Sequence, residues 1–258
     1  VLSSLEGMDS QLSDDGVTFQ LHRNKDNLGA GWGRHQLISM MSGDYLVQMD
    51  SDIVVPSRWS ERLMDHFLRQ PDVGVVGAMA SHAWGKQDAK HVSPTHGKQT
   101  ADGIVPGLDE FSEELYQRNK GWLIETFRVG TGTMMTTRDV VDKIGGFDSF
   151  GLWGNEDFDF SWRASIAGFI TGIARDCYVY HHGHGGAKQL NWHVVASNSQ
   201  SKFNKKWGIP VGDPGVWLAL GEQYMMTRPF DAARDFIPLL ESSKMETSIG
   251  DLRAMGGL

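Results

Sequence analysis

Short apolar runs of strand length alternate with helix-patterned segments in the first third of this chain, and this alternation restricts the fold most. Val17–His22 alternates apolar and polar residues, and Tyr45–Met49 has the composition of a buried strand, so both are predicted strands of one sheet. Apolar residues at helical spacing occupy Gly33–Met41 and, after Pro56, Ser57–Arg69. The order strand, helix, strand, helix is therefore expected from the start.

Pro71 ends the second helical segment, and Val73–Met79 follows as an apolar strand with the composition of a buried parallel one. This alternation predicts the α/β class, with a mixed, mainly parallel sheet and helices on both faces. A chain of 258 residues with 40% hydrophobic content can bury one such core. We expect one large domain over residues 1–208 and a helical extension over residues 209–258.

The rest of the chain continues the pattern after a long interruption. Ser81–Leu108 is rich in Gly, His, Lys, Gln and Pro and is predicted to be a surface loop. The elements predicted after it are a helix at Asp109–Asn119, extended segments at Trp122–Phe127 and Gly130–Thr136, a helix at Thr137–Ile144, a helix begun by Asn155 and closed by Gly168, and strands at Phe169–Ile173 and Cys177–Tyr180.

Charge and cysteine content narrow the functional classes. The formal net charge of -8 provides no broad basic surface, so nucleic acid is not an expected partner. Cys177 is the single cysteine, so no intrachain disulfide can form, which fits a reducing compartment and a cytoplasmic location. No apolar run approaches the roughly 20 residues that span a bilayer, and the first residues lack the layout of a signal peptide.

Two acidic segments suit chemistry on a charged substrate. Asp50-Ser51-Asp52 follows a predicted strand, where carboxylates can hold Mg2+ or Mn2+ against a diphosphate, although the same residues also suit an ordinary turn. Glu156 and Asp157 open a predicted helix, where they either stabilise the helix end or supply a general base. Because successive helical residues are turned by about 100°, these two carboxylates cannot serve one site in the same way.

Two further segments have both a functional and an ordinary explanation. His181, His182 and His184 follow a predicted strand and are either metal ligands or exposed loop residues; alternation along the strand allows at most two to reach one ion. The turn from Asn27 to Arg34 is rich in glycine and enters a helix. It either brings backbone amides to a phosphate, with Arg34 as an ionic partner, or is a plain tight turn.

Taken in order, these segments resemble the family-2 glycosyltransferases and their GT-A relatives, over about residues 17 to 207. The matching positions are Asn27, Gly29, Gly33 and Arg34; then Asp50, Asp52 and Pro56; then Gly145, Gly146, Phe147 and Asp148; then Glu156, Asp157 and Asp159; and finally His181. Two departures stand out: His35 replaces the usual asparagine, and the family's first two nucleotide-binding strands have no counterpart. The resemblance therefore implies a GT-A (Rossmann-like) catalytic domain that is incomplete at its N-terminus.

The resemblance also implies an activity. The chain would transfer a hexosyl group, with inversion, from a nucleotide-diphosphate sugar such as a UDP-sugar to a hydroxyl of a glycan or lipid-linked acceptor. Polysaccharide biosynthesis for the cell envelope, at the cytoplasmic face of a membrane, fits this class.

The resemblance assigns roles to individual residues. Asp50, Asp52 and His181 would bind Mn2+ or Mg2+, with His182 or His184 as alternatives to His181. Asp157 would be the base, and Glu156 would help to orient the acceptor. Donor contacts are implied for Asn27, Gly29, Arg34, Asp50, Asp52, Gly146 and Trp153, although Trp153 equally suits a place in the core.

Three rival interpretations remain. Asp50-Ser51-Asp52-Ile53-Val54 also matches the nucleophile loop of haloacid-dehalogenase-like phosphatases, although that loop usually follows the first strand. His182-Gly183-His184 is conceivable in a zinc hydrolase, but no HExxH helix accompanies it. A donor-binding or scaffold module without catalysis is the non-enzymatic alternative.

Overall fold

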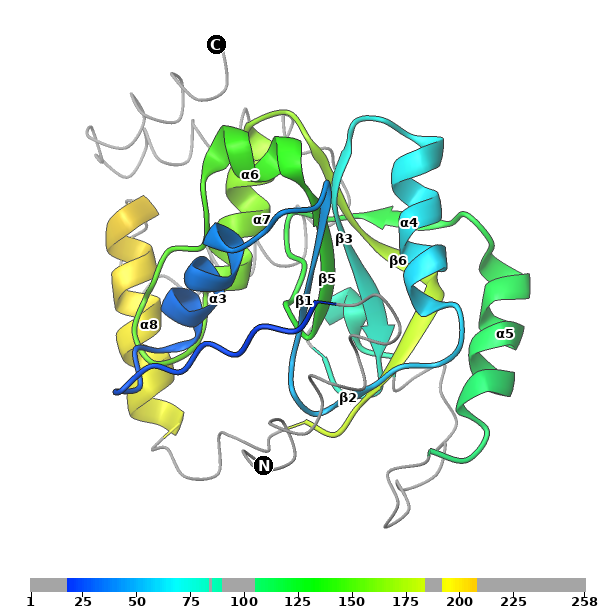
Figure 1. Cartoon of the computed structure of the whole chain (residues 1–258), viewed down its shortest axis with the longest axis horizontal. Coiled ribbons are helices and arrows are strands. Elements are labelled where there is room, and N and C mark those ends of the chain that lie inside the picture. Colours follow the sequence, from blue (N-terminus) through cyan, green and yellow to red (C-terminus); the bar gives the residue numbers. More distant parts are fainter. Residues whose placement is uncertain (1–17, 84, 90–104, 184–191, 208–258) are drawn as a thin grey trace, which may run out of the picture.

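The structure, a computed structural model, describes residues 18–83, 85–89, 105–183 and 192–207 (Figure 1). His184, the predicted domain boundary at residue 208 and the predicted extension over residues 209–258 lie outside these ranges. None of the described helices is long and apolar enough to cross a membrane.

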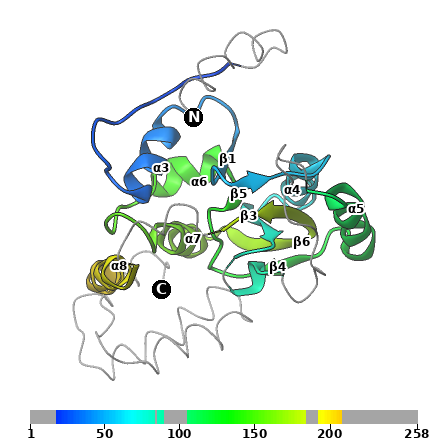
Figure 2. The ribbon, with the colours of Figure 1, turned by 90° about the horizontal axis from the view of Figure 1, so that it is seen from below.

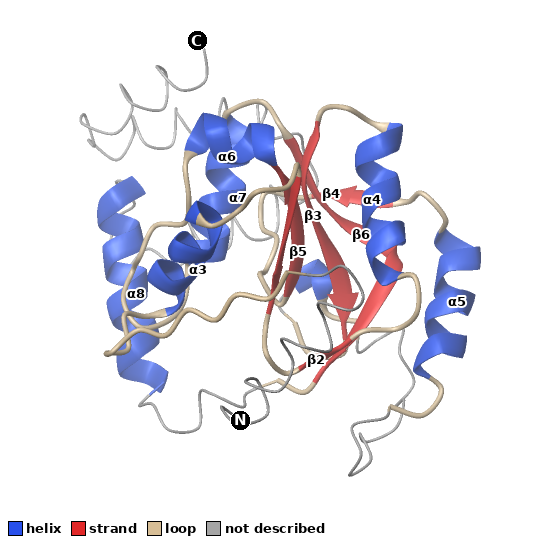
Figure 3. Ribbon diagram, in the orientation of Figure 1, coloured by secondary structure: helices blue, strands red, loops and turns tan. Residues whose placement is uncertain are grey.

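Strands occupy the middle of the molecule and helices flank them (Figure 3). In chain order the elements are α3 (Ala30–Ser39), β1 (Tyr45–Met49), β2 (Ile53–Val54), α4 (Trp59–Arg69), β3 (Val73–Ala80), the 3-10 helix η1 (Gly85–Gln87), α5 (Leu108–Asn119), β4 (Leu123–Glu125), β5 (Thr133–Thr137), α6 (Arg138–Ile144), α7 (Glu156–Ile166), β6 (Ile170–His181) and α8 (Trp192–Trp207).

The six described strands form one mixed sheet in the order β1-β5-β3-β6-β2, with β4 also paired to β6. The predicted α/β class and mixed sheet are confirmed. Among pairs of the described strands, only β3 and β6 are parallel, so the sheet contains more antiparallel pairs than the mainly parallel sheet that the sequence predicts. The difference arises because β5 lies between β1 and β3 and is antiparallel to both, while β2 and β4 are antiparallel to β6.

Helices pack on both faces of the sheet, as predicted. Val75 and Val76 are neighbours on β3 and point to opposite faces. Val75 belongs to a buried cluster with Val140 of α6 and Phe160 of α7, whereas Val76 belongs to another with Leu63 of α4. A further layer is formed by α8, because α7 lies between α8 and the sheet in two perpendicular views (Figures 1 and 2).

One predicted strand is wrong. Thr18–His22 has no regular structure, and Leu21 is 49% exposed although the alternating pattern would place it against a core. The segment has the composition of a strand but pairs with none of the described strands, and unpaired strands are not stable. By contrast, the predicted strand Tyr45–Met49 coincides with β1, and α4 and α5 begin within two residues of their predicted starts.

The two strands predicted on either side of Arg175 are a single strand, β6. Its pairing with β3 jumps from Ala174 to Tyr178, so the intervening polar residues form an irregularity within the strand instead of a break. Asp176 is buried there and accepts hydrogen bonds from His66 Nε2 at 2.8 Å and from the Gly121 amide at 2.7 Å. These hydrogen bonds compensate the Asp176 carboxylate for the solvating water that it loses on burial.

The predicted surface loop after Ala80 is partly buried where the structure describes it. Gln87 and Ala89 are buried, and the Ala89 amide donates to the Ala80 carbonyl at 2.8 Å. The Gln87 side-chain oxygen accepts from the Gly130 amide at 2.8 Å, while its Nε2 donates to the Gly130 carbonyl at 3.3 Å. The beginning of the loop therefore fixes the backbone at Gly130, which lies beside the candidate site.

Candidate active site

Strand pairing brings together three possible metal ligands. Asp50 follows β1, Asp52 precedes β2, and His181 ends β6, where it pairs with Ile53 of β2. One ligand atom from each of the three side chains lies within 4.8 Å of the other two. We call Asp50, Asp52 and His181 the acidic cluster. The antiparallel pairing of β2 with β6 explains why residues so distant in sequence meet here.

The imidazole of His181 is oriented as a metal ligand would be. Its Nδ1 atom lies 2.6 Å from the His82 carbonyl oxygen, which can only accept, so Nδ1 carries a proton. Its Nε2 atom therefore faces Asp52, 3.2 Å from Oδ1. A carbonyl that orients a ligating histidine in this way is usual around protein metals, and the two carboxylates suit Mg2+ or Mn2+, with the imidazole as a third possible ligand. The donor set fits the predicted ion, and occupancy itself stays a prediction.

His181 is better placed than its neighbour for this role. Among the residues that the structure describes, the group with metal-site spacing contains His181 and leaves out His182. The His182 ring lies edge-on to the Tyr180 ring, with 5.0 Å between the ring centres. Alternation along the strand end explains why the two histidines have different surroundings.

Arg34 of α3 connects the acidic cluster with the start of α7. Its Nη2 donates to Asp50 Oδ1 at 2.9 Å and its Nη1 donates to Glu156 Oε1 at 2.6 Å. Charge-assisted bonds of this kind from one planar guanidinium fix the two carboxylates relative to each other. The predicted contact of Arg34 with a donor phosphate stays a prediction, but its position beside Asp50 is compatible with it.

Glu156 is buried, and its burial changes the pKa of its carboxyl group. Burial, followed by the neighbouring negative charge of Asp157, raises the pKa of Glu156 to about 7, although Arg34 acts in the opposite direction. A carboxylate in the first helical turn is normally kept ionised by the helix dipole, but at Glu156 burial outweighs this effect. Its carboxyl group points to Arg34, in keeping with an orienting role for this residue.

Asp157 and the acidic cluster both lie near a short segment that contains two glycines. A Cβ atom placed on Gly130 would lie 3.6 Å from Asp157 Oδ2, and one on Gly132 would lie 3.9 Å from both Asp50 Oδ2 and His181 Nδ1. The Cα atoms of Gly130 and Gly132 are at most about 7 Å apart. The half-buried Asp157 carboxylate and the acidic cluster are therefore both close to residues 130–132.

The glycine-rich turn before α3 serves close backbone packing. Gly29 has φ 88°, and a Cβ there would lie 2.2 Å from the Gly151 carbonyl oxygen; the corresponding distance from Gly31 to the Asp148 oxygen is 2.4 Å. The Ala30 amide donates to the Leu152 carbonyl at 3.0 Å. Asn27 Oδ1 accepts from the Gly29 amide at 3.0 Å. These contacts favour the tight-turn explanation, and donor contacts of Asn27 and Gly29 stay predictions.

This packing predicts opposite effects for two alanine substitutions. Gly29→Ala is expected to lower the free energy of unfolding by about 2–4 kcal/mol, because the new methyl group meets backbone and φ is positive. Gly33→Ala, in the interior of α3 with no atom within 4 Å of the added Cβ, should raise it by about 0.5–1 kcal/mol. Urea denaturation measures both; equal effects would contradict the close approach of α3 to residues 148–152.

Gly146 and Trp153 are the last two residues predicted to contact the nucleotide-sugar donor, and they have different surroundings. Gly146 is packed between helices: a Cβ there would lie 2.6 Å from His35 Nδ1, and its carbonyl accepts from Arg163 Nη2 at 2.8 Å. Trp153 is 38% exposed on the loop before α7, which contradicts a core position and leaves its ring accessible. Donor contacts of both residues stay predictions.

Two contributors to the site were missed by sequence reasoning. Gln87, which holds Gly130, lies in a stretch without periodicity and carries no sequence signal. Helix α8 was not predicted either, although Ser199, Phe203 and Trp207 recur at a spacing of four residues and are buried on one face. That periodicity is the signal that could have revealed the helix.

Fold and site together define the class of the protein. A mixed α/β sheet with helices on both faces, and an aspartate pair at the end of a strand beside a late histidine, are the features of a GT-A protein. The sequence profile of "Glycosyl transferase family 2" matches residues 10–145, which is more than half of the chain. The chain belongs to this family.

One solved structure supports the fold, and a second has a lower similarity. A mannosyltransferase, PcManGT from Pyrobaculum calidifontis, in complex with GDP-Man and Mn2+, has a TM-score of 0.52 at 13% sequence identity, covering 96% of this chain and 64% of that one. GalNAc-T7 with UDP, GalNAc and Mn2+ has a TM-score of 0.49 at 15% identity, covering 92% of this chain and 49% of that one. The chain thus spans less than two thirds of each. No curated protein matches the sequence.

Proposed function

We propose that this chain is a metal-dependent inverting glycosyltransferase of the hexosyl type. It would take a nucleotide-diphosphate sugar, a UDP-sugar in our proposal, and transfer the sugar to an acceptor hydroxyl. One observation supports the proposal: Asp157 and the acidic cluster both lie close to the same three-residue segment, residues 130–132. The proposed base and the proposed metal ligands are therefore near one another.

Each described residue has a task in such a reaction. Asp50, Asp52 and His181 would hold the divalent cation, which when bound neutralises negative charge on the departing diphosphate. Arg34 keeps Asp50 and Glu156 in fixed relation. Asp157, which lies close to Gly130, accepts the proton of the acceptor hydroxyl. Attack from the base side, opposite the diphosphate, inverts the anomeric centre.

The acceptor and the setting are proposed from the family resemblance. We propose a hydroxyl of a glycan or lipid-linked saccharide, in polysaccharide biosynthesis for the cell envelope at the cytoplasmic face of a membrane. The catalytic domain in this proposal extends to residue 208 and is followed by a helical extension over residues 209–258. Family membership supports the transferase against the phosphatase and zinc-hydrolase alternatives.

The proposed function is tested with a panel of nucleotide sugars and Mn2+. We expect manganese-dependent hydrolysis of one donor, with a rise in rate when the correct acceptor is added and an inverted product anomer by NMR. Chelation of the metal should abolish the reaction. Binding of a nucleotide without turnover would favour a donor-binding module, lack of any nucleotide binding would favour a scaffold, and a retained anomer would contradict the inverting assignment.

A further inference from the structure

A buried carboxylate lies close in sequence to the proposed base. Asp159, two residues after Asp157 in α7, is 0% exposed. It accepts hydrogen bonds from Arg163 Nε at 2.8 Å and Trp207 Nε1 at 2.9 Å, and it forms an ion pair with Lys206 Nζ. A buried carboxylate is stable only when several donors compensate its charge. Two of the donors to Asp159 come from the end of α8, so this contact fixes the position of that end relative to α7.

Lys206 has a second anionic partner on a different segment. Its Nζ also bonds to Asp148, in the turn that follows α6. The same ammonium lies 5.7 Å from the centre of the Phe150 ring and 5.2 Å from that of Trp207, distances at which cations are attracted to aromatic faces. Lys206 thus joins α7, α8 and the turn at Asp148 through one charged group.

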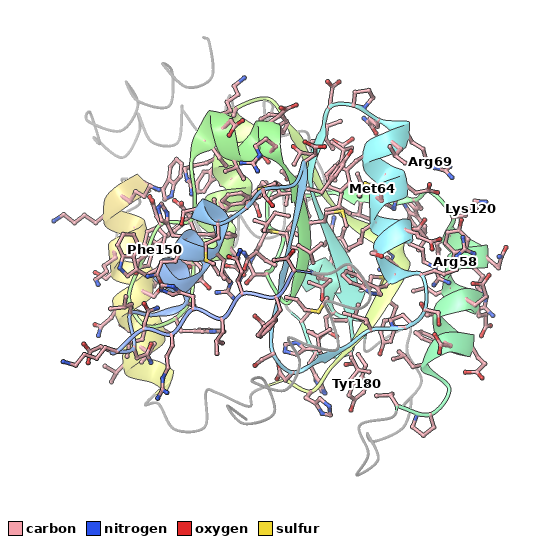
Figure 4. All side chains as sticks on the ribbon, viewed as in Figure 1. Arg58, Met64, Arg69, Lys120, Phe150 and Tyr180 are labelled. Carbon is pink, nitrogen blue, oxygen red and sulfur yellow. The ribbon has the colours of Figure 1, made fainter. Side chains whose placement is uncertain are left out.

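Helix α8 also holds the residue that starts α7. Asn155 has φ 68°, a left-handed conformation that is uncommon for residues other than glycine. Its Nδ2 donates to Ser199 Oγ at 3.0 Å, and Ser199 donates to the Gly154 carbonyl. Packing reinforces the contact, because Phe203 stacks on Phe158 with 5.0 Å between ring centres. Phe150, labelled in Figure 4, lies on the loop beside α8 and packs against the same Phe203 ring.

We infer that Lys206 is a positioning residue that sets the orientation of the Asp157 carboxylate. Asp157 lies between Asn155, held by Ser199, and Asp159, held by Lys206, so α8 fixes the first turn of α7 at both ends. Lys206 touches none of the acidic cluster among its described contacts. The inference rests on the proposed function, since it concerns the efficiency of the proposed base rather than donor binding.

The test compares substitutions at two adjacent lysines of α8. Lys206→Met removes the charge at nearly constant length and should lower kcat by about tenfold to a hundredfold, since misplacement of a reacting group by about 1 Å has effects of this size. KM for the donor and the affinity for Mn2+ should change less than about twofold. Lys206→Arg should restore most of the turnover, and Lys205→Met, at the neighbouring exposed lysine, should behave as the unsubstituted protein.

The outcomes separate the inference from the proposed function. An active unsubstituted protein whose Lys206→Met variant keeps full kcat, or whose donor KM rises instead, overturns the positioning role. If Lys206→Met does not fold by circular dichroism, Lys206→Gln decides, because it removes the charge that pairs with Asp159 and Asp148 and keeps a polar side chain. That variant should lower kcat by about threefold at constant KM, and an unchanged kcat overturns the inference. Absence of turnover in the unsubstituted protein rejects the proposed function, and the positioning role with it.

Discussion

The Asp157→Asn variant is expected to lose about a thousandfold in transfer rate while still binding the nucleotide sugar. Asparagine has nearly the shape of aspartate but cannot accept the acceptor's proton, and general bases contribute about 10²–10⁴ to enzymatic rates. Asp157 is half-buried beside Gly130, and the acidic cluster lies close to Gly132, so the substitution should leave metal and donor binding intact. Steady-state kinetics with the donor identified in the panel, and calorimetry of donor binding, measure the two effects separately.

Asp139→Asn is the matched control for this prediction. Asp139 also lies in the first turn of a helix, α6, and its side chain is exposed. A carboxylate that merely stabilises a helix end should give the same small effect at both positions. If the two variants retain equal, near-normal activity, Asp157 is a helix-end residue and the base must be sought elsewhere.

Asp52→Asn is expected to weaken Mn2+ binding by about a hundredfold or more, with a parallel loss of donor affinity. Asp52 supplies one of three ligand atoms, and its carboxylate faces the Nε2 atom of His181 at 3.2 Å. Removing its charge leaves the cluster with a single carboxylate, which binds hard divalent cations poorly. Calorimetric titration of Mn2+ in the presence of UDP gives the affinity directly.

The control for this second prediction lies at the opposite end of the neighbouring strand. Asp44 immediately precedes β1, whereas Asp50 follows it, and Asp44 is exposed. Asp44→Asn changes the net charge equally and should leave the Mn2+ affinity unchanged. A similar loss of affinity in both variants would mean that overall charge, and not the acidic cluster, governs metal binding.

Local sequence patterns predicted those strands and helices whose formation depends mainly on their own residues. The bounds of β1 were predicted to the residue, because a compact run of β-forming residues favours a strand. Its predicted burial is wrong: β1 lies at the edge of the described sheet, and Tyr45 and Met49 at its ends are exposed. The cluster of Asp50, Asp52 and His181 was also anticipated, since order and spacing along the chain resemble a known family. Thr18–His22 shows the limit of such patterns, because alternation alone does not supply a strand with a partner.

Contacts between distant segments could not be predicted from local patterns. Asn155 was expected to cap α7 with its side chain, and it occupies that position, but its amide instead contacts Ser199 of α8. Gly29 was considered for phosphate binding, yet its lack of a side chain is required by Gly151, 122 residues later in the chain. In each case the sequence identifies the residue, and the tertiary neighbour decides what it does.

The most direct test of the account is the location of Mn2+ in crystals grown with UDP, by anomalous diffraction. The account predicts one anomalous peak in contact with Asp52 and His181, next to Asp50 and touching the diphosphate, with Asp157 facing it across residues 130–132. Manganese bound elsewhere, or UDP bound without manganese at these three side chains, would contradict the central claim.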